Sequence, residues 1–201
     1  MINGLTDHAR IAVALAQHEA ERLSVPFIGD DILLIGLAQA VSRPGMRGLW
    51  PWIKLLVSPS PSARANAHGC KMVRTVFTQS CLDVDHLSAA VELQTADQRQ
   101  GQPRAVATGP LPFTADAKAT LVVAGGQAQA RAHLHCGAEH LLLGLLTNEH
   151  GAATKVIAAC GVAPAALRAA LLELMPMPPS QPTENPATPQ LPPPAPSAYN
   201  R

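Results

Sequence analysis

Two carboxylates stand directly before apolar segments of the sequence. Asp31 precedes residues 32–38 and Glu139 precedes residues 140–146. If each segment is a helix, an acid at its start suits the positive end of the helix dipole. A carboxylate also pairs well with a planar guanidinium, and free amides at a helix N-terminus suit a phosphate. Asp31 and Glu139 are therefore either helix caps without a ligand or binding residues.

Two threonines occupy a similar position before other helical segments. Thr6 precedes residues 7–23, and Thr114 precedes an Ala-rich stretch. A threonine oxygen can accept a hydrogen bond from a free amide in the first helical turn. We predict that Thr6 and Thr114 are N-caps first and ligand contacts second.

Several potential zinc ligands cluster in the second half of the chain, since imidazole and thiolate both bind zinc. They are His133, His135, Cys136 and His140, with His150 further on. No second Cys/His pair has the spacing of a zinc site, so we predict no metal. His140 is interpreted as part of the cap of the helix that follows Glu139, and as a possible ligand contact.

No arrangement typical of an enzyme is found. No Ser-His-Asp or Cys-His set can be assembled, and Asp83, Asp85 and His86 fit an acidic helix start. The Gly-x-x-x-x-Gly-Lys-Ser/Thr phosphate loop is absent, which excludes ATP hydrolysis by that loop. We predict a non-catalytic protein without a cofactor.

Trp50 and Trp52 either anchor a loop or form a contact surface for a partner, since Trp is common in interface hot spots.

The composition predicts a helical core. Hydrophobic residues make up 47% of the 201 residues but aromatics only 3%, so Ala, Leu, Val and Ile must fill the core. A net charge of +1 gives no reason to expect nucleic acid or an anionic membrane as partner. The four cysteines form no CxxC pair, and no signal peptide or membrane-length apolar run is present. We expect a cytoplasmic protein with reduced, mostly buried thiols.

The chain contains an internal repeat. Residues 5–37 match residues 113–145 at a constant separation of 108 positions. The matched positions include Thr, Ala, Gly, Leu and acidic residues. Residues 87–91 match residues 167–171 at a separation of 80. The difference of 28 predicts an insertion in the first copy.

These matches divide the chain into parts. The double-repeat domain is expected over residues 1–175, with repeat one at about 4–94, an insertion at about 40–68, a flexible linker at 95–110 and repeat two at 111–175. Pro and Gly make most of the insertion a loop, with a possible short helix at 52–57. Proline dominates residues 176–201, which predicts a disordered tail.

Each repeat is predicted to hold four helices. In repeat one they cover residues 7–23, 32–38 and 71–79, and a fourth opens at 83–85. In repeat two they comprise a first helix interrupted at Gly125-Gly126, then 140–146, 152–160 and one that opens at Ala163-Pro164. The fold class is therefore all-α, with two four-helix units packed as a pseudo-twofold pair.

The segment Cys136-Gly137-Ala138-Glu139-His140-Leu141-Leu142-Leu143-Gly144-Leu145 resembles the Clp N-terminal domain, the double Clp repeat of ClpA- and ClpC-like unfoldases. Residues 27–37 resemble the same pattern, with Asp31-Ile32 in place of Glu-His. The resemblance covers about residues 4–39 and 68–175. It implies a domain that receives adaptors, protein substrates and, in some members, phospho-arginine. Asp31 and Glu139 would then receive the guanidinium.

Two hypotheses follow from the resemblance. In the first, the chain is a protein- or peptide-binding adaptor, regulator or decoy of a Clp protease system, with Clp protease components or adaptors as partners. In the second, the chain is a scaffold that kept the fold but binds another partner through the Trp-bearing insertion. Loss of capture on deleting residues 43–62 but not in Glu139→Ala would favour the second hypothesis.

Overall fold

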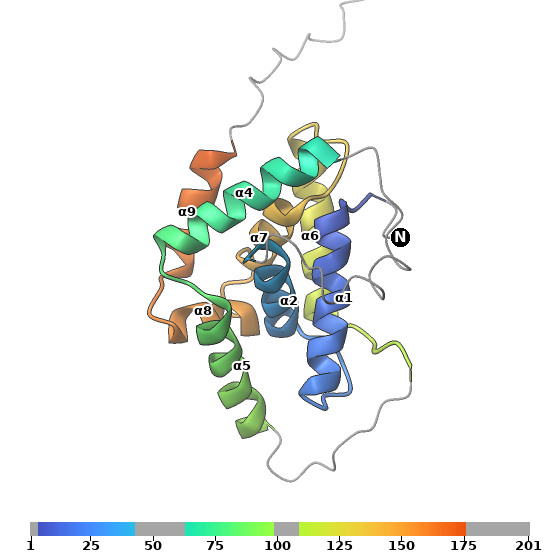
Figure 1. Ribbon diagram of the computed structural model, residues 1–201, viewed down its shortest axis with the longest axis vertical. Helices are drawn as coiled ribbons and strands as arrows, with labels where there is room; N and C mark the ends of the chain where they lie inside the picture. The colour runs from blue at the N-terminus through green and yellow to red at the C-terminus, as the bar shows by residue number, and fades with distance from the viewer. Residues whose placement is uncertain (1–3, 43–62, 99–108, 176–201) are drawn as a thin grey trace, which may run out of the picture.

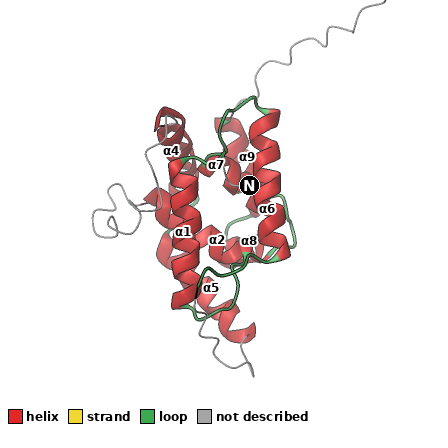
Figure 2. Cartoon of the chain, turned by 90° about the vertical axis from the view of Figure 1, so that its right-hand side faces the viewer, coloured by secondary structure: helices red, strands yellow, loops and turns green. Residues whose placement is uncertain are grey.

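The computed structural model describes residues 4–42, 63–98 and 109–175. All regular elements of these residues are helices (Figures 1 and 2). The first four are α1 (Asp7–Arg22), α2 (Asp30–Ser42), α4 (Ala63–Gln79) and α5 (Val84–Gln98). The second four are α6 (Ala115–Ala130), α7 (Ala138–Leu145), α8 (Ala152–Ala159) and α9 (Pro164–Leu174). The prediction of an all-α fold with two four-helix repeats is confirmed.

Two short backbone pairings relate the repeats. Leu5 forms an isolated parallel bridge with Cys136, and Ile28 forms one with Phe113. Positions 5 and 113 are 108 residues apart, and so are positions 28 and 136. Each repeat therefore offers the same two segments to its neighbour, as pseudo-twofold symmetry requires.

Left-handed backbone conformations follow the same repeat. The chain turns after α1 at Ser24, with φ 53°, and after α6 at Ala132, with φ 54°. It turns after α4 at Cys81, with φ 53°, and after α8 at Gly161, with φ 79°. The first pair is 108 positions apart and the second 80, so both separations found in the sequence mark equivalent turns in the structure.

The first and second helices of each repeat cross at a glycine. A Cβ on Gly36 of α2 would fall against the backbone of α1 at Ala12 and Ala16. A Cβ on Gly144 of α7 would lie 2.6 Å from the carbonyl oxygen of Thr120 in α6. Both crossings thus need a residue without a side chain, which lets the helix backbones approach closely.

The third helix of each repeat packs on the other repeat. Helix α4 contacts α7 and α9, whereas α8 contacts α2 and α5 (Figure 1). A side chain joins the repeats at one of these contacts, because the Ala153 amide at the start of α8 donates to Asp30 Oδ2 at 3.4 Å. The two bundles are therefore interlocked, and α2 and α7 contact each other between them.

Three local predictions are corrected by the structure. Gly125 and Gly126 do not interrupt the first helix of repeat two, because α6 is continuous. Its buried face, formed by Ala117, Thr120, Ala124 and Ala128, packs well enough to offset about 1 kcal/mol per glycine. Helix α4 begins at Ala63 rather than residue 71, and α5 extends to Gln98, into the expected linker. The helix expected at 52–57, residues 99–108 and the tail lie outside the described residues.

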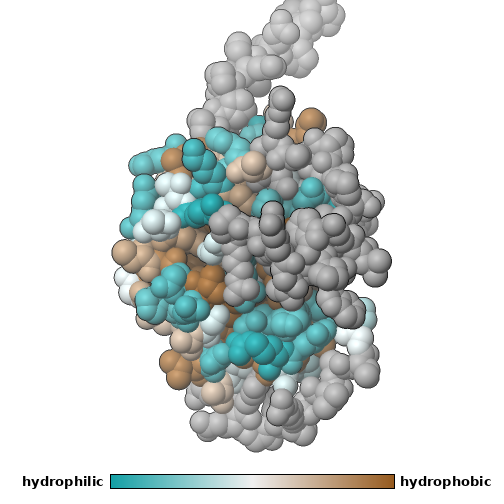
Figure 3. Space-filling model, viewed as in Figure 1, coloured by the Kyte–Doolittle hydropathy of each residue, from teal (hydrophilic) through white to brown (hydrophobic). Residues whose placement is uncertain are grey.

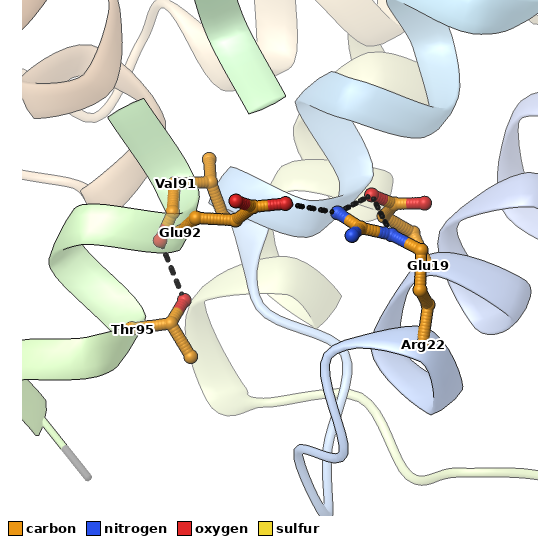
Figure 4. Close-up of polar contacts among 5 residues, drawn as sticks. All are labelled: Glu19, Arg22, Val91, Glu92 and Thr95. Carbon is orange, nitrogen blue, oxygen red and sulfur yellow. Dashed lines mark hydrogen bonds and ion pairs between the residues drawn. The ribbon is translucent and has the colours of Figure 1, made fainter. Parts of the chain in front are cut away.

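Within the described ranges, a charged link between the first and fourth helices is found in repeat one alone (Figure 4). Arg22 in α1 donates from Nε and Nη2 to Glu19 Oε1, at 2.9 and 2.6 Å. Nη2 also donates to Glu92 Oε1 in α5 at 2.7 Å, and both acids raise the pKa of Arg22. The equivalent positions in repeat two are Ala130, Gln127 and Leu172, so this link has no counterpart there.

Polar residues cover much of the described surface on the face shown in Figure 3, with a smaller apolar area among them. Within the described ranges, no single helix is long and apolar enough to cross a membrane. The pair α8 and α9 passes that test only when taken together, and it bends by 101°.

Candidate functional site

Both predicted threonine caps are confirmed. Thr6 Oγ1 accepts from the Ala9 amide at 3.4 Å, and Thr114 Oγ1 accepts from the Ala117 amide at 3.1 Å. Thr6 is only 1% exposed, so its hydroxyl is engaged inside the domain. A ligand role for the two threonines stays a prediction.

The backbone pairings bring each threonine to the acid of the other repeat. The Thr6 amide donates to the carbonyl of Cys136 at 2.9 Å, just before α7 and Glu139. The Thr114 amide donates to the carbonyl of Ile28 at 3.0 Å, just before α2 and Asp31. Each candidate site is therefore shared between the repeats, which linear sequence reasoning did not reveal.

Asp31 lies buried in the first turn of α2, with 9% of its surface exposed. Its Oδ1 accepts from the Ile32 amide at 2.8 Å. Desolvation nevertheless raises the pKa of Asp31 above its usual value, with a further contribution from the charge of Asp30. Burial of this carboxylate in its charged form therefore costs stability, as is common at binding sites.

We expect Asp31→Asn to raise the free energy of unfolding at pH 7. The folded-state pKa of Asp31 is raised, so the protein loses stability as pH rises from about 3.9, the unfolded value, through the folded value. The gain from asparagine should disappear below about pH 4, where aspartate is neutral in both states. Urea unfolding across this pH range measures the effect.

Asp116→Asn is the matched control for this change. Asp116 lies in the first turn of α6 but is exposed, so its loss removes only a favourable dipole interaction. It should slightly lower stability at pH 7. An Asp31→Asn protein that is less stable than the parent at pH 7 would contradict the assigned desolvation.

Glu139 is the more enclosed of the two acids, with 5% of its surface exposed. Its carboxylate lies between Gly137 and Gly69 of α4, where a Cβ on either glycine would overlap it. Among the described residues, Glu139 Oε2 is buried without a hydrogen-bond partner. An unpartnered carboxylate oxygen in a buried position favours a cationic ligand over simple capping.

His140 completes the start of α7. The Gly137 amide donates to His140 Nδ1 at 3.0 Å, which confirms the predicted role in the cap. Because Nδ1 accepts, Nε2 carries the proton and donates to His133 Nδ1 at 2.8 Å. The pKa of His133 is lowered by desolvation and by the nearby imidazole of His140. The sequence grouped these two histidines but did not predict their contact.

The cysteines are only partly as predicted. All four are free; Cys70 and Cys136 are buried, Cys160 is half-buried and Cys81 is exposed. Burial, together with the charge of Glu139, raises the pKa of both Cys70 and Cys136 to about 12. These two thiols are therefore protonated and unreactive at neutral pH.

The other candidate residues lie elsewhere. His86 Nδ1 is 3.2 Å from Asp83 Oδ2, and the His86 amide donates to Asp83 Oδ1 at 2.8 Å, as expected of an acidic helix start. Trp50 and Trp52 lie outside the described residues. Within the described ranges, the candidate site is therefore the pair of helix starts at Asp31 and Glu139.

Fold and site together define an all-helical domain of two interlocked repeats whose acids stand at matched helix starts. The family model described as "Clp repeat (R) N-terminal domain" matches residues 112–200, a range that begins at repeat two. It describes a repeat domain and no catalytic family. Residues 112–200 are therefore similar to the Clp repeat N-terminal domain, and the relatives and solved structures extend this similarity over most of the chain.

Among solved structures, the N-terminal domain of the chaperone ClpD from Arabidopsis thaliana matches with a TM-score of 0.58 and 19% identity. The match covers 86% of this chain and 95% of that one. The Hsp104 N-terminal domain from Candida albicans matches with a TM-score of 0.56 and 12% identity, over 85% and 91% of the two chains. These matches confirm the fold.

Among sequence relatives, the chloroplastic chaperone protein ClpC2 of Oryza sativa subsp. japonica is 26% identical over 175 residues. The chloroplastic chaperone protein ClpC of Pisum sativum is also 26% identical over 175 residues. Each match covers 87% of this chain but only 16% and 15% of the relatives. The chain thus spans about one sixth of the length of these proteins.

Proposed function

We propose that this domain binds protein segments and that the start of α7 receives a cationic side chain from them. The buried Glu139 oxygen without a partner carries this proposal. An arginine side chain would supply the missing donors and the balancing charge. The amides of the first turn of α7 and the positive end of its dipole would suit a phosphate on that arginine.

An exposed apolar side chain lies close in sequence to each acid. Leu134 is 91% exposed in the loop before α7, and Phe27 is 43% exposed in the loop before α2. A peptide with an apolar residue beside its arginine would contact both parts of one site. Two such sites in one chain would also favour ligands with two suitable segments, through a higher effective concentration.

The proposed biological role is an adaptor, regulator or decoy in Clp-type proteolysis in the cytoplasm, with Clp protease components or their adaptors as partners. The relatives include chaperones of the ClpC type, which supports this class of partner. The Trp-bearing insertion provides the alternative contact surface and is tested in the same experiment.

The test titrates a fluorescent phospho-arginine peptide against the full chain and follows its anisotropy. We expect binding, and an affinity about tenfold or more weaker in Glu139→Gln, because a charge-assisted hydrogen bond contributes about 1.5–3 kcal/mol. Glutamine keeps the shape of the side chain and removes only the charge. The same peptide with unmodified arginine measures the contribution of the phosphate.

Glu149→Gln is the matched control, because Glu149 is an exposed acid of the same repeat. Its affinity should equal that of the parent chain. Equal affinities for Glu139→Gln and Glu149→Gln would refute the assigned site. If deletion of residues 43–62 abolishes capture of a Clp-system partner while Glu139→Gln retains it, the contact surface is the insertion.

A further inference from the structure

Two imidazoles and a carboxylate converge at the start of α7. One ligand atom from each of His133, Glu139 and His140 lies within 4.8 Å of the others. His133 Nδ1 and His140 Nε2 are 2.8 Å apart, and the two rings meet edge to face with centroids 4.9 Å apart. His140 is fully buried whereas His133 is exposed, so the cluster is fixed at one end and open to solvent at the other.

We propose that this cluster binds a divalent transition-metal ion of the zinc type, between His133 Nδ1 and His140 Nε2. Imidazole nitrogen is a preferred zinc ligand, and the ion would replace the proton that the two rings now share. The site shares Glu139 with the proposed recognition of peptides, but the two imidazoles hold the ion, so zinc binding is tested without a peptide.

Glu139 completes the chemistry of the site. With Nε2 on the ion, the proton of His140 moves to Nδ1, which lies 3.1 Å from Glu139 Oε1. Nδ1 then donates to this carboxylate and no longer accepts from the Gly137 amide. A carboxylate that holds the second nitrogen of a metal-bound histidine is a common arrangement, and it increases affinity. The ion would also balance the charge of a carboxylate whose Oε2 is buried without a partner among the described residues.

Repeat one lacks the ligands for an equivalent site. The positions that correspond to His133, Glu139 and His140 are Val25, Asp31 and Ile32. The part of the chain that the structure describes therefore offers one such site, at repeat two. The sequence alone predicted no metal, because it offers no second Cys/His pair; the ligands are instead brought together across the loop before α7.

The test titrates zinc chloride into the full chain, without an affinity tag, by isothermal titration calorimetry. We expect one zinc ion per chain and an affinity at least about tenfold weaker in His133→Ala, which removes one ligand at an exposed position. Glu139→Gln should weaken binding about 10- to 100-fold, as loss of the partner of a metal-bound histidine does. Circular dichroism verifies that each variant is folded.

Two control variants separate this site from adventitious binding. His86→Ala removes an exposed histidine that lies beside a carboxylate but contacts no second imidazole among the described residues, and it should bind zinc as the parent does. Cys136→Ser should also retain the ion. Absence of zinc binding in the parent, equal binding in His133→Ala, or loss of zinc in Cys136→Ser would each overturn the proposal.

Discussion

Replacing Gly36 by alanine is expected to lower the free energy of unfolding by about 2–3 kcal/mol. The added Cβ would lie 2.7 Å from the Ala16 amide nitrogen and 3.0 Å from its Cβ, and would also overlap the Ala12 carbonyl oxygen. Most of these atoms belong to the backbone of α1, so no side-chain rotation relieves the clash. The helices must separate, and neighbouring core residues then lose contact.

Gly126→Ala is the matched control, because it makes the same substitution inside a helix. Nothing lies within 4 Å of a Cβ at Gly126, so alanine there should stabilise the protein by up to about 1 kcal/mol. Urea unfolding of the two variants should therefore give shifts of opposite sign. If Gly36→Ala is as stable as the parent, α1 and α2 do not approach as closely as described.

Leu142→Ala is expected to cost about 3–5 kcal/mol, because it leaves a cavity in the centre of the domain. Leu142 is fully buried in α7, the helix that contacts α2, α4, α6 and α9. Because helices of both repeats surround Leu142, the neighbouring side chains are unable to move easily into the cavity. Thermal or urea unfolding measures the loss.

Leu34→Ala tests whether the two repeats contribute equally. Leu34 is the counterpart of Leu142, 108 positions earlier, and it is also fully buried. The two variants should lose similar amounts of stability, whereas Leu93→Ala, at a residue 74% exposed, should change it by less than about 0.5 kcal/mol. A cost below 1 kcal/mol for Leu142→Ala would mean that the core is loosely packed there.

The helices could be predicted from the sequence because the residues that begin them act locally. Thr6 and Thr114 cap helices where their side chains and positions indicated, and Pro164 opens α9. The glycine pair at 125–126 misled the prediction, since the propensity penalty is local while the packing of α6 that offsets it is tertiary. The beginning of α4 was missed for a similar reason: nearby Pro residues favoured a loop.

The sequence predicted where the single residues of the candidate site lie along the helices, but not which of them contact one another. Position alone placed Asp31 and Glu139 at the starts of helices. The shared sites depend on contacts over about a hundred residues, such as Thr6 with Cys136. The contact of Glu139 with Gly69 is also long-range, because the two residues are 70 positions apart. The His133–His140 contact needed the turn at Ala132.

The crosswise bridges at Leu5–Cys136 and Ile28–Phe113 give the domain the geometry of an isologous dimer within one polypeptide. In such a dimer each surface patch meets its own copy, so a substitution in one patch would act twice. Covalent fusion removes that constraint, because either copy can now change alone. Among the described residues, the charged link at Arg22 and the histidine pair at α7 each occur in one half only, as this freedom allows.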